Sequence, residues 1–401
     1  MESLKNGRAQ KQTPPRVEIL ADYTALTIRS GYAGAMDWPF EVTSSKILAR
    51  ESMNRIPTLD GWRGVAILLV IVSHLQTSLL GHLYRGYSWM DVGQHGVEIF
   101  FILSGYLITT LLLEEEKINL KRFYLRRFFR LMPCAWVYLL TLAVIALVTH
   151  SHSIGKDVWP CLFFYRNYYP PESAANVLTG HFWSLSLEEQ FYLFWPPLLF
   201  VIGRRWAWKL AAFGAIACAV YRFYHWNNYD CNDPLLLSHR SEVRVDALFV
   251  GCTLAFLLKD LRVRAWILRF GSALFWLCIP VLAWHFYRFQ RLLPLSEALV
   301  VATMIACTSV NFRSLAAKAL EWKHLKFIGL ISYSLYVWQQ RMLFISQWQR
   351  QGAVFLPLVA IGSYGLIERP CIRLGRRLEQ ALQSRNTRLG EEAETAEPAT
   401  P

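Results

Sequence analysis

Ten apolar segments separated by short polar stretches are the feature that most limits how this chain can fold. Each is long enough, or nearly so, to cross a hydrocarbon core about 30 Å thick. They are residues 62–82, 95–113, 131–149, 185–203, 207–226, 243–258, 266–286, 293–311, 327–348 and 353–369. A segment inside lipid must satisfy its backbone hydrogen bonds internally, so this series predicts helices. We expect an all-α, polytopic transmembrane bundle.

Composition supports a membrane protein. Hydrophobic residues make up 54% of the 401 residues and charged residues only 18%, whereas a soluble domain carries about 25% charged residues. The net charge of +13 would suggest nucleic acid in a soluble protein. Here the basic residues lie between apolar segments, which is typical of membrane topology. We therefore expect a lipid bilayer as partner and no nucleic acid.

The eight cysteines include no CxxC pair, and most lie in apolar stretches. We interpret them as small core residues. A disulfide between Cys161 and Cys231, both near the predicted outer face, is the alternative. The sequence also contains no HExxH motif, and we predict no metal site.

The positions of lysine and arginine orient the predicted helices. With ten spans and a cytoplasmic N-terminus, the basic clusters fall on the inner side, as the positive-inside rule requires. These clusters contain Lys117, Lys121, Arg122, Arg126, Arg127, Arg130, Arg204, Arg205, Lys209, Lys259, Arg262, Arg264, Arg313, Lys318, Lys323, Lys326, Arg369, Arg373, Arg376 and Arg377. An additional apolar stretch, 158–168, would reverse the later clusters if it spanned, so we expect it to be re-entrant or interfacial. Both termini are predicted to be cytoplasmic.

The two ends of the chain differ from the membrane core at 55–378. Residues 1–54 are polar and mixed and contain no secretory apolar region. They form either a genuine cytoplasmic tail or a flexible extension that precedes the true start at Met53. Residues 379–401 are acidic, and we expect a disordered tail there.

Arg63 and His74 are the first candidates for chemistry. They lie 11 residues apart, about three helical turns, so they share one helix face about 16 Å apart. His74 follows a long aliphatic run and lies well inside the bilayer, where an ionisable residue is costly and usually functional. Its ordinary pKa suits a general base. A histidine that packs helices through a polar partner is the alternative.

Two further charged motifs lie at segment boundaries. Arg127 and Arg130 share a helix face, and guanidinium groups suit phosphates; an ordinary cytoplasmic anchor is the alternative. Glu188 and Glu189 enter an apolar helix about 100° apart, so at least one is expected to face the interior. Glu188 is the candidate for holding a buried arginine or a substrate hydroxyl. The alternative is solvated acids in an interfacial aromatic belt.

Arg244, Asp246, Tyr333 and Trp338 are candidate substrate contacts. Arg244 and Asp246 stand at the predicted outer start of a span, where they are expected to pair with each other or with Glu188. A structural ion pair fits these two residues as well as a substrate contact does. Tyr333 and Trp338 belong to a stretch rich in hydroxyl and aromatic side chains, which either lines a polar cavity or packs helices.

Taken together, these residues resemble the acyltransferase 3 family of membrane O-acyltransferases over about residues 55–378. The strongest signature is Arg-x10-His, matched by Arg63 and His74. The other matches are Phe100–Ile108, Arg127-x-x-Arg130-x-x-Pro133, Trp183-Ser184-Leu185 with Glu188, Arg244 with Asp246, and Glu368-Arg369-Pro370. Each motif is weak alone, and their order and spacing make the resemblance strong.

The resemblance implies a donor and an acceptor. The donor is an acyl-CoA, usually acetyl-CoA, which acts as a substrate rather than as a permanently bound cofactor. The acceptor is a hydroxyl of a carbohydrate or lipid-linked glycan, and the location implied is a bacterial inner membrane. His74 would act as general base, and Arg63 would stabilise the oxyanion or position CoA. Arg127 and Arg130 would bind CoA phosphates, while Glu188 would orient an arginine or the acceptor. Direct transfer and a covalent acyl-enzyme both fit.

Two features depart from the family pattern. Family members commonly have a histidine after Tyr-x-Trp, but here Gln339 follows Trp338, and an amide cannot take up a proton at neutral pH. The chain also ends soon after the core, so the SGNH hydrolase-like domain of some relatives is not expected.

Two other classes of function fit part of the pattern. A transporter or flippase is the main alternative, because intramembrane charges also mark transport pathways. Such proteins often have broken helices at matching positions of two halves, and no such pattern is visible. An acyltransferase-like protein that senses its ligand without catalysis is the third possibility, against which the intact Arg63 and His74 pair argues.

Overall fold

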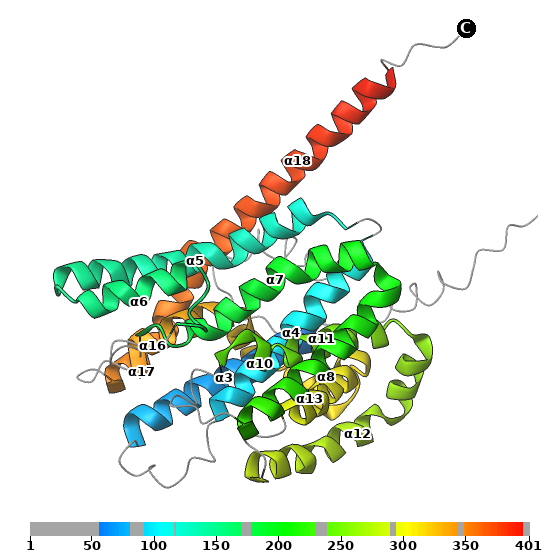
Figure 1. The fold of residues 1–401 in the computed structure, drawn as a ribbon, viewed down its shortest axis with the longest axis horizontal. Helices are drawn as coiled ribbons and strands as arrows, with labels where there is room; N and C mark the ends of the chain where they lie inside the picture. The colour runs from blue at the N-terminus through cyan, green and yellow to red at the C-terminus, as the bar shows by residue number, and fades with distance from the viewer. Residues whose placement is uncertain are drawn as a thin grey trace, which may run out of the picture. The chain divides into compact units, whose positions relative to one another are not determined.

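The computed structural model describes residues 56–80, 92–115, 118–169, 178–228, 239–288, 294–343 and 349–395. Within these ranges every regular element is helical, which confirms the predicted all-α class. The helices are α3 (Pro57–Leu80), α4 (Val92–Glu114), α5 (Leu120–Val148), α6 (His152–Leu162), α7 (Phe182–Ile202), α8 (Arg204–Asn228), α10 (Ser241–Arg244), α11 (Asp246–Leu257), α12 (Leu261–Arg288), α13 (Pro294–Val310), α14 (Leu315–Leu320), α15 (Lys323–Leu330), α16 (Ser332–Leu343), α17 (Gln349–Ser363), the π-helical turn η4 (Tyr364–Glu368) and α18 (Arg369–Thr395) (Figure 1). The predicted N-terminal extension, 1–54, lies outside the described residues.

Some of the helices have the length and composition of membrane spans. In the described part of the chain, five stretches are long and apolar enough to cross a membrane: Pro57–Leu75, Val92–Glu114, Leu120–Val148, Leu261–His285 and Gln351–Gln383. Two more apolar helices, Asp246–Leu257 and Leu295–Val310, are shorter. The predicted span 327–348 is divided at Ile331 into α15 and α16. A polytopic helical protein is therefore supported, while ten spans and cytoplasmic termini stay predictions.

The additional apolar stretch, 158–168, begins within α6 and continues into turns. This helix has 11 residues, about 16 Å of length, which is too short to cross a bilayer. It packs against α5. Cys161 on α6 is a buried free thiol, and Cys231 lies outside the described residues, so a disulfide between them stays untested.

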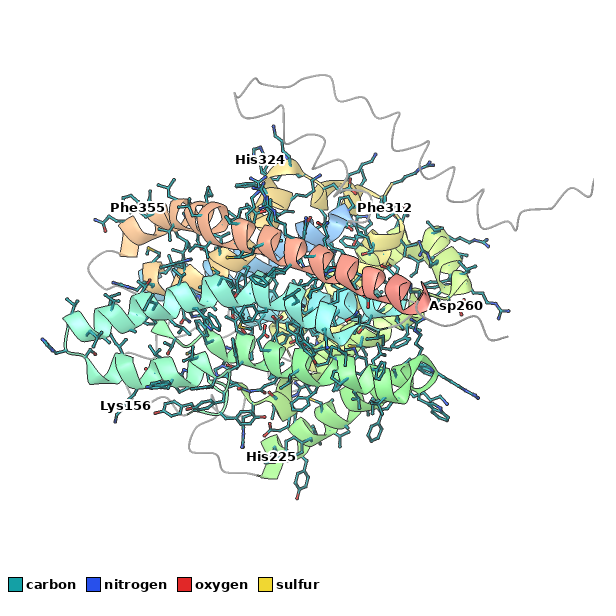
Figure 2. All side chains as sticks on the ribbon, turned by 90° about the horizontal axis from the view of Figure 1, so that it is seen from above. Lys156, His225, Asp260, Phe312, His324 and Phe355 are labelled. Atoms are coloured by element: carbon teal, nitrogen blue, oxygen red, sulfur yellow. The ribbon has the colours of Figure 1, made fainter. Side chains whose placement is uncertain are left out.

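Large apolar side chains lie on the outside of the helices. Leu147 on α5, Val201 on α7 and Leu277 on α12 are 74%, 79% and 63% exposed. Charged side chains such as Lys156 and Asp260 also lie at the periphery (Figure 2). So much apolar surface is costly in water, and a lipid environment removes that cost. The exposed leucines and valines therefore support a membrane setting for this bundle.

Helix α18 runs beside α5 (Figure 1). The carboxylate of Glu379 on α18 pairs with Arg122 and with Arg126 on α5, and its Oε2 lies 2.6 Å from Arg126 Nε. Residues 379–395 continue α18 as a helix, whereas the sequence led us to expect a disordered tail from residue 379. The physical reason is that these two ion pairs anchor the helix beyond residue 378, which the acidic composition alone did not reveal.

Helices α4 and α11 approach each other closely because each presents a glycine to the other. A Cβ at Gly105 would lie 2.0 Å from the carbonyl oxygen of Leu248, and a Cβ at Gly251 would lie 2.2 Å from that of Ile102. Small residues that let backbones meet are typical of helix packing in membranes. This crossing fixes Glu98 on α4 relative to Asp246 on α11.

Replacing Gly251 by valine is expected to destabilise the protein by about 3 kcal/mol, because the new side chain must push α4 away. The measurement is the thermal unfolding midpoint of the purified protein in detergent. Gly155→Val on α6 is the matched control, since no other group lies within 4 Å of a Cβ there. Equal midpoints for the two variants would show that this close approach does not matter.

Candidate active site

His74 lies against an amide of α16. Its Nδ1 is 3.1 Å from Oε1 of Gln339. An amide oxygen can only accept, so the ring nitrogen Nδ1 donates this hydrogen bond, and Nε2 becomes the basic nitrogen of the neutral imidazole. Gln339 is fully buried, and its Nε2 has no partner among the described residues. The position at which the sequence departs from the family pattern is thus in direct contact with the candidate base.

Arg63 lies on the same helix as His74 but belongs to a different group of side chains. Its Nη1 is 3.3 Å from Oδ1 of Asp60. It also interacts electrostatically with the carboxylates of Glu188 and Glu368. Because 11 residues separate it from His74, about 16 Å lie between them along the helix axis.

Glu188 faces the protein interior, as predicted for at least one of the two adjacent glutamates. Its Oε1 accepts a hydrogen bond of 2.9 Å from Ser104 of α4. Its carboxylate interacts electrostatically with Arg127, whose guanidinium lies 4.0 Å from the centre of the Tyr192 ring. Glu188 therefore lies near a half-buried arginine, where the sequence led us to expect a buried one, beside a hydroxyl that fixes its orientation.

Glu368 completes this group, which we call the arginine–glutamate cluster: Arg63, Arg127, Arg130, Glu188 and Glu368. It is 3% exposed, accepts a hydrogen bond of 3.0 Å from Ser334 and interacts electrostatically with Arg130. It lies in the π-helical turn η4, and such turns are frequent at functional sites. The cluster combines guanidinium groups and buried carboxylates from α3, α5, α7 and η4.

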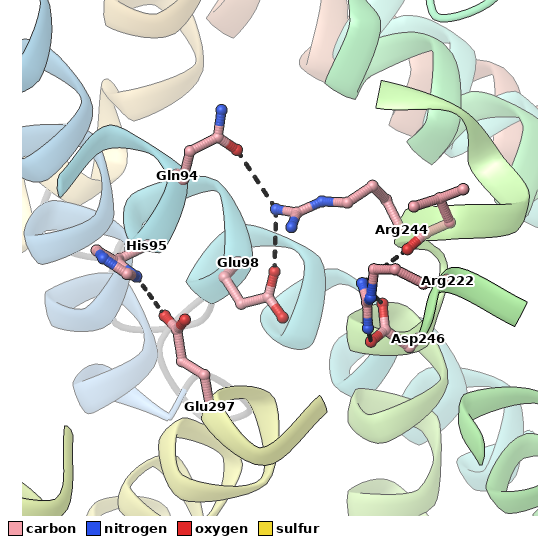
Figure 3. A network of polar contacts seen from close by, with 8 residues as sticks. Gln94, His95, Glu98, Arg222, Arg244, Asp246 and Glu297 are labelled. Atoms are coloured by element: carbon pink, nitrogen blue, oxygen red, sulfur yellow. Dashed lines mark hydrogen bonds and ion pairs between the residues drawn. The ribbon is translucent and has the colours of Figure 1, made fainter. Parts of the chain in front are cut away.

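A second polar group, which we call the Arg244 network, contains Gln94, His95, Glu98, Arg222, Arg244, Asp246 and Glu297 (Figure 3). Arg244 Nη2 lies 3.3 Å from Glu98 Oε2 and 3.4 Å from Gln94 Oε1. His95 Nδ1 lies 2.5 Å from Glu297 Oε1. Both Glu98 Oε1 and Arg244 Nε are buried without a hydrogen-bond partner among the described residues.

Comparison with known proteins decides the family. The family model for the acyltransferase domain matches residues 56–366. The chain belongs to the acyltransferase 3 family. The match covers the whole Arg244 network, the His74–Gln339 pair and the arginine–glutamate cluster except Glu368, which lies just beyond it.

Several curated relatives of this acyltransferase 3 protein carry O-acetyltransferase names. It is 28% identical over 325 residues to the peptidoglycan O-acetyltransferase OatA of Listeria monocytogenes, covering 73% of this chain and 50% of that protein. It is 29% identical over 326 residues to the putative peptidoglycan O-acetyltransferase YrhL of Bacillus subtilis, covering 73% and 49%. The chain spans about half the length of these relatives. No solved structure matches the chain.

We expected Arg244 and Asp246 to pair with each other or with Glu188. That expectation is wrong, because the structure gives both residues other partners. Asp246 pairs with Arg222, whose Nη1 lies 3.3 Å from Asp246 Oδ1, while Arg244 pairs with Glu98. Asp246 starts α11 whereas Arg244 ends α10, and their side chains reach different neighbours. Asp246 is 1% exposed and has both oxygens bonded to Arg222, which fits the structural ion pair that was one of the two expectations for it.

Tyr333 and Trp338 also have defined neighbours. The hydroxyl of Tyr333 donates to the carbonyl oxygen of Leu131 on α5 at 2.7 Å, so it packs α16 against α5. The indole of Trp338 meets the ring of Tyr138 edge-on, with ring centres 5.3 Å apart. Its Nε1 is buried without a hydrogen-bond partner among the described residues. Of these two candidates, only Trp338 has a donor available for a ligand.

The sequence interpretation missed Glu98, Arg222 and Glu297. All three lie inside segments that were recognised as apolar, 95–113, 207–226 and 293–311. An ionisable residue in such a segment is a functional candidate by default. Applying that rule to every predicted helix would have found them, although not their partners.

Proposed function

We propose that the protein is a membrane O-acyltransferase that moves an acetyl group from acetyl-CoA to a hydroxyl of a cell-surface carbohydrate. The observation that carries the proposal is the contact between His74 and Gln339. This contact places a basic nitrogen inside a helical core that the acyltransferase domain family matches. The names of the relatives support acetyl as the acyl group and a glycan as the acceptor.

The proposed reaction needs one proton transfer to His74 and one from it. Nε2 of His74 takes the proton of the acceptor hydroxyl as its oxygen attacks the thioester carbon. The carbon–sulfur bond then breaks, and the CoA thiolate takes the proton from the imidazolium. Gln339 Oε1 holds Nδ1–H throughout, and the unpartnered Gln339 Nε2 is a donor for the oxygen that gains negative charge. Ester and free CoA result, with no other reactant required.

The arginine–glutamate cluster is the proposed site for the CoA phosphates. Arg127 has a buried Nε without a partner among the described residues, and guanidinium groups bind phosphate oxygens in a fork geometry. CoA carries its thioester at the end of a long flexible arm. A separation of about 16 Å between Arg63 and His74 suits a donor whose phosphates and thioester lie far apart. This spacing favours positioning of CoA as the role of Arg63.

The Arg244 network is the proposed site for the acceptor. Arg244 lies over the ring of Trp183, 5.9 Å from its centre, and Trp183 stacks on His239 at 4.4 Å. Aromatic faces beside charged donors and acceptors suit a carbohydrate, which has apolar ring faces and polar edges. Under the ten-span topology this network lies towards the outer face of a bacterial inner membrane.

Replacing Arg127 and Arg130 together by glutamine is expected to raise the KM for acetyl-CoA at least tenfold, because two charge-assisted phosphate contacts are lost. The kcat at saturating donor should change less. Lys121→Gln is the matched control, since Lys121 is an exposed basic residue of the same helix. An unchanged KM in the double variant would remove the two arginines from the donor site.

The experiment that tests the proposed function uses the purified full chain, acetyl-CoA labelled in the acetyl group, and a panel of glycans. Covalent transfer of label to a glycan is the expected result. In sealed vesicles, uptake of unmodified glycan without any labelled ester would contradict the proposal and indicate a transporter.

A further inference from the structure

A second histidine, His181, is held beside His74 by the same helix. It precedes α7 and is 3% exposed. Its Nδ1 lies 2.7 Å from Oε1 of Gln340, and its backbone N–H donates to the same oxygen at 3.1 Å. As with Gln339, the amide oxygen can only accept, so the proton of the neutral ring lies on Nδ1. Two adjacent glutamines of α16 thus each hold one histidine through Nδ1.

The orientation of His181 is fixed on several sides. The hydroxyl of Tyr336 donates to the backbone carbonyl of His181 at 3.2 Å, and the Tyr336 ring lies edge-on to the imidazole with ring centres 5.6 Å apart. The ring of Tyr138 meets the imidazole from another direction at 5.5 Å. His181 also interacts electrostatically with His74. The two imidazoles are therefore linked through adjacent residues of α16, His74 through Gln339 and His181 through Gln340.

His181 Nε2 has no hydrogen-bond partner among the described residues, although the atom is buried. With the proton on Nδ1, Nε2 is an acceptor. A buried acceptor that nothing satisfies is rare in folded proteins, because it loses its hydrogen bond to water without a replacement. A group that satisfies it must bring a hydrogen-bond donor, and a hydroxyl has this property.

We propose that His181 binds the acceptor through a second hydroxyl: its Nε2 accepts a hydrogen bond from a hydroxyl neighbouring the one that His74 deprotonates. The inference rests on the proposed function and narrows its substrate class to polyhydroxylated acceptors such as sugar rings, rather than simple alcohols. No bond to His181 is made or broken. Its effect is to select which hydroxyl faces His74.

Two substitutions of His181 test the roles of its two ring nitrogens separately. In His181→Asn the side-chain amide reaches only the Nδ1 position, so the contact with Gln340 is kept and the acceptor at Nε2 is lost. In His181→Gln the longer side chain places an amide near the Nε2 position. His150→Asn is the control, because His150 is exposed and has a φ of 51°, a conformation that asparagine adopts readily.

The experiment uses the purified full chain, labelled acetyl-CoA, and the methyl glycoside of N-acetylglucosamine with its set of monodeoxy analogues. In the wild type, removal of the acylated hydroxyl should abolish transfer, and removal of its neighbour should slow it about tenfold, the loss expected for one enclosed hydrogen bond. His181→Asn should slow transfer to the parent sugar about tenfold and no longer distinguish it from the neighbouring deoxy analogue. His181→Gln should keep part of that discrimination.

Hydrolysis of acetyl-CoA by water distinguishes acceptor binding from a purely structural role of His181. Loss of a structural role would slow hydrolysis and transfer equally. Hydrolysis needs no second hydroxyl, so His181→Asn should lower transfer to the parent sugar about tenfold more than it lowers hydrolysis. An equal loss of hydrolysis and transfer, or undiminished discrimination, would overturn the assignment. Hydrolysis by the wild type without transfer to any sugar would overturn it too, while leaving acyl-CoA chemistry at His74 intact. No turnover of acetyl-CoA at all would instead overturn the proposed function.

Discussion

Replacing His74 by alanine is expected to lower acyl transfer by a factor of about 10²–10⁴, the contribution of a positioned general base. Because alanine favours the helix and the imidazole contacts the side chain of Gln339, expression and membrane insertion should be unchanged. The measurement is the rate of label transfer from acetyl-CoA to glycan by purified variants with matched elution profiles. His324→Ala, at an exposed position of α15, is the control.

Gln339→Ala extends this test to the partner of His74. Loss of both the Nδ1 contact and the proposed oxyanion donor is expected to cost about 10²-fold in kcat. Gln339→His, which restores the residue common in the family, should retain more activity than the alanine variant. Retention of full activity in His74→Ala would remove this residue from the mechanism. An unaffected Gln339→Ala would confine the role of Gln339 to packing.

Replacing Asp246 by leucine is expected to destabilise the protein by about 3–5 kcal/mol. The substitution leaves the guanidinium of Arg222 buried without its carboxylate, and an uncompensated buried charge is costly. In the double variant Arg222→Met, Asp246→Leu, both charges are gone, so most of the stability should return. The measurement is the thermal unfolding midpoint in detergent of the wild type, both single variants and the double variant.

The activity of the double variant separates structure from substrate binding. Since Asp246 has both oxygens bonded to Arg222, the stable double variant should retain acyl transfer. Arg244→Lys, which keeps a positive charge beside the buried Glu98, should instead impair the use of the acceptor. A double variant as unstable as Asp246→Leu would contradict the pairing. A stable but inactive double variant would indicate that Asp246 contacts the acceptor.

The helices were predictable because the backbone hydrogen bonds that form them join residues close together in the sequence. Long apolar runs require internally bonded backbone, so the helical class and the places of α3, α4, α5 and α12 follow from the sequence. The division of 327–348 at Ile331 and the continuation of α18 past residue 378 depend on packing between distant segments. No local pattern carries that information.

The site was predictable to a smaller extent. Residue type and depth singled out His74, Arg63 and Glu188, because ionisable groups are costly in lipid. Their partners were not predictable, since side chains far apart in the chain supply them: Gln339 lies 265 positions from His74, and Glu98 lies 146 positions from Arg244. The closeness of Arg244 and Asp246 in sequence suggested a pair that does not form, because Arg222 and Glu98 from other helices pair with them instead.

Comparison of surface glycans by mass spectrometry tests whether His74 catalyses glycan acetylation in the cell. The strains lack the protein or carry either the wild type or His74→Ala at equal membrane levels. We expect the mass of one acetyl group on a glycan fragment with the wild type and its absence in both other strains. Its presence with His74→Ala would contradict catalysis by this histidine. Identical glycans in all three strains would contradict glycan acylation by this protein.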